Sequence, residues 1–92
     1  MVTSENYALP FFRVKTLYLL EAIWEQNQDL RFNQLIYNLY REYSSENNQL
    51  GQVLECDSNG FVAKMAFDFF YLEDDEFIRF MEKKLKLTNS NR

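Results

Sequence analysis

Apolar and polar residues recur with helical spacing along most of the chain, most clearly between Leu17 and Tyr43. At about 100° per residue, the apolar residues from Pro10 to Glu25 spread over a broad arc. The residues of this arc are Phe12, Leu17, Leu19, Leu20, Ile23 and Trp24. So wide an arc predicts a helix from about Pro10 to Glu25 whose apolar residues are buried and which the other helices pack around.

A second helix is predicted after a short polar break. Asp29 is a favourable N-cap residue because its carboxylate can accept the free N–H groups of a first turn, so we expect this helix to begin near Leu30. Its apolar side consists of Phe32, Leu35, Ile36, Leu39 and Tyr43. Its polar side consists of Arg31, Gln34, Asn38 and Arg41. The pattern predicts an amphipathic helix with one buried face and one exposed face.

The segment of residues 50–71 has two interpretations. Alternation from Phe61 to Phe69 favours a strand, and Asp57–Gly60 would then form the turn of a β-hairpin with Gln52–Cys56. The residues Val62, Met65, Ala66, Phe69 and Phe70 also have helical spacing. Both alternatives stay open, and we favour a fourth helix because the rest of the chain is helical and a lone two-stranded hairpin is weakly stable.

A last helix is predicted from Glu73 onward. Its first residues are the acidic run Glu73, Asp74, Asp75 and Glu76, and its apolar stripe is Phe77, Ile78, Met81 and Leu85. Acids at the start of a helix and lysines near its end, here Lys83, Lys84 and Lys86, both suit the helix dipole. The fold class is therefore mainly α: a small helical bundle of three main helices with a variable middle segment, in a single domain of residues 1–92.

Composition narrows the functional classes. Nine Phe and six Tyr are more rings than so small a core needs, and surplus exposed aromatic area is typical of proteins that bind another protein or a second copy. A net charge of -4 disfavours direct nucleic-acid binding. No apolar run approaches the roughly 20 residues of a membrane span. The single cysteine, Cys56, fits a reducing compartment, so we expect a cytoplasmic protein.

Candidate chemistry is sparse. The chain has no histidine, which removes the commonest general base and the commonest transition-metal ligand. Asp57–Gly60 resembles part of a calcium loop, but Phe61, Ala63 and Met65 occupy the positions of further ligands. We therefore expect a protein that is not an enzyme, with no catalytic residues, no metal site and no cofactor.

Two surfaces are candidate binding sites. The first is the polar side of the second helix with one bordering tyrosine: Arg31, Gln34, Tyr37, Asn38 and Arg41. Tyrosine and arginine are typical of protein interfaces, so we expect another protein as the partner. The same side chains can read base edges, which leaves a small helix-turn-helix-like DNA-binding regulator as an alternative. The second surface is the acidic run Glu73, Asp74, Asp75 and Glu76, for which a dipole-favoured helix start is the preferred explanation.

Parts of the chain resemble small bacterial and phage proteins of the YihD-like kind. The matching strings are Leu20-x-x-x-Trp24, Asp29-Leu30-Arg31-Phe32-x-Gln34-Leu35-Ile36 and Phe70-Tyr71-Leu72-Glu73-Asp74-Asp75-Glu76-Phe77. Such proteins are helical and have no assigned enzymatic activity, so the resemblance implies a helical, non-catalytic protein. The chain departs from them between Ser44 and Asp68, and Gln28 stands where a proline is expected.

Size, acidity and this resemblance together favour a non-catalytic protein-binding module. A specific version is a phage or mobile-element inhibitor of a host defence protein, anti-CRISPR-like in its role, whose acidic surface stands in for nucleic acid. Its partner would be a nucleic-acid-binding host protein. A self-associating structural protein, such as a homodimer, is a further alternative.

Overall fold

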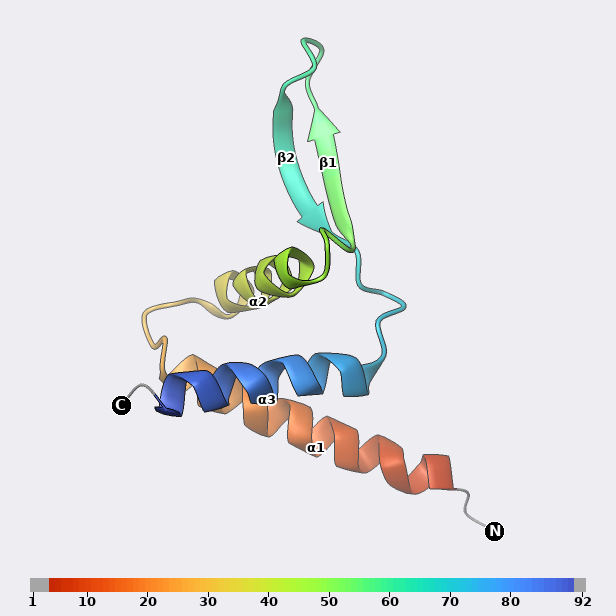
Figure 1. Ribbon diagram of the computed structural model, residues 1–92, viewed down its shortest axis with the longest axis vertical. Helices are drawn as coiled ribbons and strands as arrows, with labels where there is room; N and C mark the ends of the chain where they lie inside the picture. Colours follow the sequence, from red (N-terminus) through yellow and green to blue (C-terminus); the bar gives the residue numbers. More distant parts are fainter. Residues whose placement is uncertain (1–3, 91–92) are drawn as a thin grey trace. The chain divides into compact units, whose positions relative to one another are not determined.

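A computed structural model describes the backbone of residues 4–90 and the side chains of residues 11–86. The elements follow one another as α1 (Ser4–Glu25), α2 (Phe32–Glu46), β1 (Gln52–Cys56), β2 (Val62–Phe67) and α3 (Asp74–Ser90), as Figure 1 shows. The prediction of a mainly α fold with three main helices is confirmed. The elements form two compact units, one holding α1 and α3 and the other, Asn33–Tyr71, holding α2 and the two strands.

The middle segment contains a two-stranded antiparallel hairpin, which confirms one of the two alternatives for residues 50–71; the fourth helix, which we favour from the sequence, is wrong. The turn lies where the sequence predicts it. The Asp57 Oδ1 atom accepts hydrogen bonds from the N–H groups of Asn59 (2.9 Å) and Phe61 (3.0 Å), and Gly60 has a φ of 84°. These local bonds close the turn.

The connection from α2 to β1 fixes where the hairpin begins. Asn48 and Gln49 have φ values of 59° and 65°, and the Gln49 N–H group donates to the Ser44 carbonyl oxygen (2.8 Å), which ends α2. Gly51 follows with a φ of 76°. A Cβ atom at this glycine would lie 2.5 Å from the ring of Phe69, so a side chain here would displace that ring.

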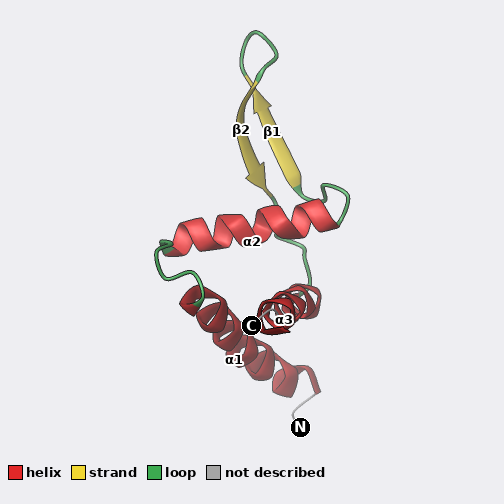
Figure 2. Ribbon diagram, turned by 60° about the vertical axis from the view of Figure 1, so that its left-hand side comes forward, coloured by secondary structure: helices red, strands yellow, loops and turns green. Residues whose placement is uncertain are grey.

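The helices α1 and α3 lie side by side in Figures 1 and 2 and pack on each other. Their buried apolar residues are Leu19, Ile23, Ile78, Phe80 and Met81. One ion pair joins the two helices, between Lys15 Nζ and Glu82 Oε2 at 3.0 Å. Among the described residues, no helix combines the length and apolarity that crossing a membrane requires.

The first helix differs from its prediction in two ways. It begins at Ser4 rather than at Pro10, so Pro10 lies within the helix and not in its first turn. Its apolar arc is also not fully buried: Leu17 is 66% exposed and Trp24 37%. The predicted burial is correct for Leu19 and Ile23 and wrong for Leu17 and Trp24.

The boundaries of the other helices also shift. The break after α1 is confirmed, but α2 begins at Phe32, so Asp29 is too early in the chain to be its N-cap. The Asn27 side chain instead donates from Nδ2 to the Ile23 carbonyl oxygen (2.9 Å) at the end of α1. The acids are in the first turn of α3 as predicted, but α3 continues to Ser90, so the lysines do not occupy its last turn.

Candidate interaction surface

Four of the five predicted partner-binding residues lie on one side of α2. Gln34, Tyr37, Asn38 and Arg41 are three or four residues apart, which places them along a single stripe of the helix. Gln34, Tyr37 and Arg41 are exposed and Asn38 is half-buried. Arg31 is exposed but immediately precedes α2, so it is not part of the helical stripe. We call the four helical residues the α2 stripe.

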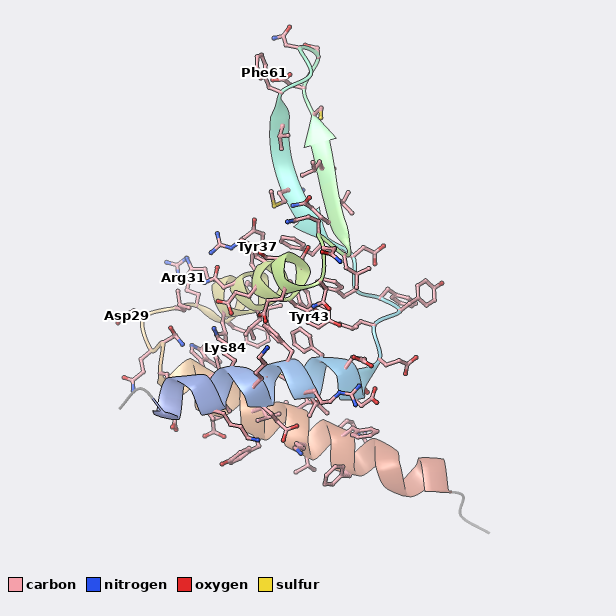
Figure 3. The ribbon with its side chains drawn as sticks, in the orientation of Figure 1. Asp29, Arg31, Tyr37, Tyr43, Phe61 and Lys84 are labelled. Atoms are coloured by element: carbon pink, nitrogen blue, oxygen red, sulfur yellow. The ribbon has the colours of Figure 1, made fainter. Side chains whose placement is uncertain are left out.

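Tyr37 also belongs to a cluster of rings that holds the base of the hairpin on α2. Its ring lies 5.5 Å from that of Phe67, while Phe69 meets Tyr40 at 5.0 Å and Tyr43 at 5.4 Å, both edge to face. The Phe67 and Phe69 rings are stacked 6.2 Å apart. Such pairs add stability beyond the area they bury. The α2 stripe is therefore joined directly to the hairpin through Tyr37, which is 40% exposed (Figure 3).

One face of the hairpin is apolar and exposed. Cross-strand partners share a face, and Leu54 pairs with Met65. Beyond a register shift between Glu55 and Cys56, which leaves Ala63 without a partner in β1, Cys56 pairs with Val62. Leu54 is 47% exposed, Met65 37% and Val62 55%, and Cys56 is exposed too. We call these four residues the hairpin face. It continues the side of the strands on which Phe67 contacts Tyr37, and Phe61, 72% exposed, lies at the tip (Figure 3).

The opposite side of the strands has a different character. Glu55 and Lys64 pair across it, next to Val53 and Ala66. Oppositely charged cross-strand partners attract each other and stay hydrated, so this side of the hairpin can remain exposed to solvent. The hairpin therefore presents one charged side and one uncharged, apolar side.

The hairpin face was not among the predicted site residues. The signal that could have found it is the alternation from Phe61 onward, which becomes a two-sided strand pattern once the Asp57–Gly60 turn is accepted. Favouring the helical spacing of the same residues hid this face, because a helical period groups Met65 with Phe69 on one side of a helix, whereas a strand places alternate residues on one side.

The charges of α2 do not form a basic surface. Arg41 is its only basic residue, and it lines an open depression of about 330 Å³ together with Glu42, Ser45 and Glu46. The two neighbouring carboxylates oppose the positive potential of the guanidinium group. A surface of this kind attracts phosphates weakly, whereas it suits the polar rim of a protein interface.

The predicted acidic surface lies at the start of α3. Glu73 immediately precedes the helix, and its carbonyl oxygen accepts the N–H groups of Glu76 and Phe77. Arg79 Nη2 lies 2.6 Å from Glu76 Oε1 and 3.9 Å from Asp75 Oδ2. The run thus has the dipole-favoured position and an ion pair within the helix, both of which are structural roles. Among the residues that the structure describes, no three or more carboxylate, cysteine or histidine side chains are grouped to hold a metal ion.

Comparison with known proteins adds no relative: no family model, no curated protein and no solved structure matches the chain. The resemblance to YihD-like proteins therefore stays an expectation from the sequence.

Proposed function

We propose that the protein is a non-catalytic protein-binding module that uses the hairpin face and the adjoining α2 stripe. The observation that carries the proposal is the exposure of Leu54, Val62 and Met65 on a hairpin whose ring contacts with α2, among the described residues, lie at its base. Isolated two-stranded hairpins are marginally stable in water, and contiguous exposed apolar area marks interaction sites. A partner that covers this face removes apolar area from water and stabilises the strands.

The layout resembles the usual composition of a protein interface. The hairpin face supplies an uncharged apolar centre, and Tyr37 lies at its edge with Gln34, Asn38 and Arg41 beyond it. Interface centres are depleted in charge and enriched in aromatic residues and methionine, whereas their rims are polar. Both strands also keep one edge without a neighbouring strand in the described chain, so a partner strand can extend the sheet.

The proposal is tested with immobilised full-length protein and a bacterial lysate. Leu54→Lys places a charge at the centre of the hairpin face and should abolish retention of any specific partner. Tyr71→Ser is the matched control, because Tyr71 is 89% exposed and lies outside the hairpin face. A specific partner is one retained by the wild type and by Tyr71→Ser but not by Leu54→Lys.

A second measurement locates the contact. Amide hydrogen exchange of β1 and β2 should slow when the partner identified in this way is added, because its binding suppresses local opening of the strands. Retention of no protein above background, or equal retention by Leu54→Lys, would contradict the proposal.

The narrower version, an inhibitor of a nucleic-acid-binding host defence protein, makes a separate prediction. Its partner should be released by duplex DNA, and Asp74→Lys should weaken the complex as much as Leu54→Lys does. If duplex DNA does not release the partner and Asp74→Lys does not weaken the complex, the protein would still be a binding module, but the nucleic-acid mimic would be excluded.

The competing function, DNA binding through α2, has its own outcome in the same experiment. It predicts that wild-type protein shifts a duplex at low salt and that Arg31→Ala and Arg41→Ala weaken this binding and lower its salt dependence. A shift of this kind, together with no protein partner, would favour the regulator.

A further inference from the structure

The hairpin has two outer edges, and they differ in regularity. Ala63 of β2 is a bulge, because the register shift leaves it without a partner, whereas each residue of Gln52–Cys56 pairs with one residue of β2. A bulge twists an edge strand away and disfavours the addition of a further strand. β1 has neither bulge nor proline, and its one charged residue, Glu55, lies opposite Lys64. The edge of β1 is therefore the one suited to strand pairing.

Two hydrogen bonds that flank β1 show which of its backbone groups face outward. The Gly51 carbonyl oxygen accepts from the Asp68 N–H group (2.8 Å), and the Asp57 N–H group donates to the Phe61 carbonyl oxygen (2.8 Å). Backbone groups alternate in direction along a strand, so the odd-numbered residues of β1 face β2 and the even-numbered ones face away. The even-numbered residues are Gln52, Leu54 and Cys56. We call their outward backbone groups the β1 edge.

We propose that the β1 edge pairs with the β1 edge of a second copy, antiparallel, with Leu54 opposite Leu54 on a two-fold axis. In this register Gln52 lies opposite Cys56 of the second copy, so every outward residue has a partner. The Leu54 N–H and carbonyl groups bond to those of the other Leu54. The Cys56 N–H group donates to the Gln52 carbonyl oxygen of the second copy, and each bond occurs twice by symmetry. The Gln52 N–H group already donates to the Gln49 carbonyl oxygen (3.2 Å).

Charge selects this register and favours a second copy as the occupant. With Leu54 on the axis, Glu55 lies opposite Val53 of the second copy, so no like charges face each other. An axis at Glu55 would place Glu55 opposite Glu55, and an axis at Cys56 would place Glu55 opposite Asp57, which is repulsive in both cases. An axis at Val53 would leave Cys56 without a partner in β1. The sequence of β1 is thus complementary to itself in one fully paired register.

The paired strands form a four-stranded sheet with two distinct sides. On one side, Met65 and Leu54 of both copies form a continuous apolar row. On the other side, Glu55 lies between Lys64 of its own chain and Val53 of the second copy. Sheets of three or more strands are stable where an isolated hairpin is marginal, so pairing stabilises both hairpins. The inference goes beyond the proposed function, because the second copy takes the β1 edge and leaves the side chains of the hairpin face open to another protein.

The interface is a single strand pair and is smaller than a standard stable interface, so we expect a weak dimer that dissociates on dilution. Sedimentation equilibrium of the full-length protein measures its dissociation constant. The test is made at Val53, which is 45% exposed, with Val53→Gln as the uncharged reference. Val53→Glu faces Glu55 of the second copy twice and should raise the dissociation constant roughly 2- to 30-fold above that reference. Val53→Lys should lower it by a similar factor.

The matched control makes the same three substitutions at Val62, an exposed valine of β2, where they should leave the dissociation constant unchanged. A monomer at about 1 mM protein would overturn the proposal. So would equal dissociation constants for Val53→Glu and Val53→Lys, or a dimer that responds to charge at Val62 instead. Val53→Glu keeps the hairpin face intact and should still retain the partner of the proposed function, so failure of either proposal is seen separately.

The register is tested by cross-linking through the native Cys56. Gln52→Cys places a thiol opposite Cys56 of the second copy, at the Cα separation of about 5.5 Å that a disulfide spans. An added oxidant should therefore link the two chains. Val53→Cys, one residue along and on the opposite side of the strand, should not form this link, and neither should the wild type, whose two Cys56 residues are not opposite each other. Equal cross-linking of both variants, or ready cross-linking of the wild type, would overturn the proposed pairing.

Discussion

The two units of the molecule differ in how their elements are held together. The α1–α3 unit buries Leu19, Ile23, Ile78, Phe80 and Met81 along its two helices and adds the Lys15–Glu82 ion pair. The other unit holds its hairpin by the rings of Tyr37, Tyr40, Tyr43, Phe67 and Phe69, all at one end of the strands. A helix pair buried along its length leaves only its outer side for binding. A hairpin anchored at one end leaves most of both strands available.

The largest loss of stability is expected from a substitution in the core of the α1–α3 unit. Met81 has no exposed surface, so Met81→Ala leaves a cavity and should lower the free energy of unfolding by roughly 2–5 kcal/mol. Urea unfolding followed by the fluorescence of Trp24, the only tryptophan, measures this. Met65→Ala removes the same atoms from the exposed hairpin face and should cost less than about 1 kcal/mol. Equal losses would mean that the hairpin face is as buried as the core.

The second largest loss of stability is expected from a substitution at the base of the hairpin, where Gly51 lies against Phe69. Gly51→Ala should destabilise the protein by about 1–3 kcal/mol, because alanine is strained at positive φ and its Cβ atom would push on Phe69. Gly60→Ala is the matched control, since Gly60 also has positive φ but has open space around it. Chemical denaturation of both variants separates the crowding at Gly51, by the Phe69 ring and the Asp68 carbonyl oxygen, from the strain of positive φ that both glycines share. If Gly60→Ala cost as much as Gly51→Ala, this crowding would contribute nothing.

A smaller effect tests the ion pair of the helix unit. Both side chains of the Lys15–Glu82 pair are about one-third exposed, so a double-mutant cycle with Lys15→Met and Glu82→Gln should give a coupling of roughly 0.2–1 kcal/mol. The coupling should fall in about 1 M salt, where charges are screened within about 3 Å. A coupling that is unchanged by salt would point to packing of the lysine stem instead of charge.

The smallest effect concerns Ser44 of α2. Its side chain is buried, and its Oγ atom makes no hydrogen bond to the described residues. A buried hydroxyl without a partner costs free energy, so Ser44→Ala should leave stability unchanged or raise it by up to about 1 kcal/mol. Thermal unfolding measures the change. A clear loss of stability would show that this hydroxyl has a bonding partner in solution.

Much of the helical fold was predictable because the apolar period and the end residues of a helix can be recognised within a few turns of the sequence. The apolar period of α2 identified Leu35, Leu39 and Tyr43, which are all buried, and the acids of α3 marked its first turn. The helix starts were less predictable, as Pro10 and Asp29 show. Each is a favourable end residue by its local chemistry, yet α1 extends beyond Pro10 to Ser4 and α2 begins at Phe32, three residues after Asp29.

The candidate site was predictable only in part. Spacing alone put Gln34, Asn38 and Arg41 on one side of α2, and the structure leaves Arg31 outside that helix. The hairpin face could not be predicted with the same ease, because Val62–Phe67 fits both a strand and a helix by its spacing. Contacts far apart in the sequence, those of Phe67 and Phe69 with the tyrosines of α2, decide between the two.

The sequence by itself determined three helices, the break between the first two and the turn at Asp57–Gly60, since periodicity and turn-forming side chains act over a few residues. Only the tertiary structure decided that the middle segment is a hairpin and which apolar residues stay exposed. Those outcomes depend on which surfaces meet: the rings of α2 hold the base of the strands, while Val14 of α1 and Leu54 of β1 remain in contact with water.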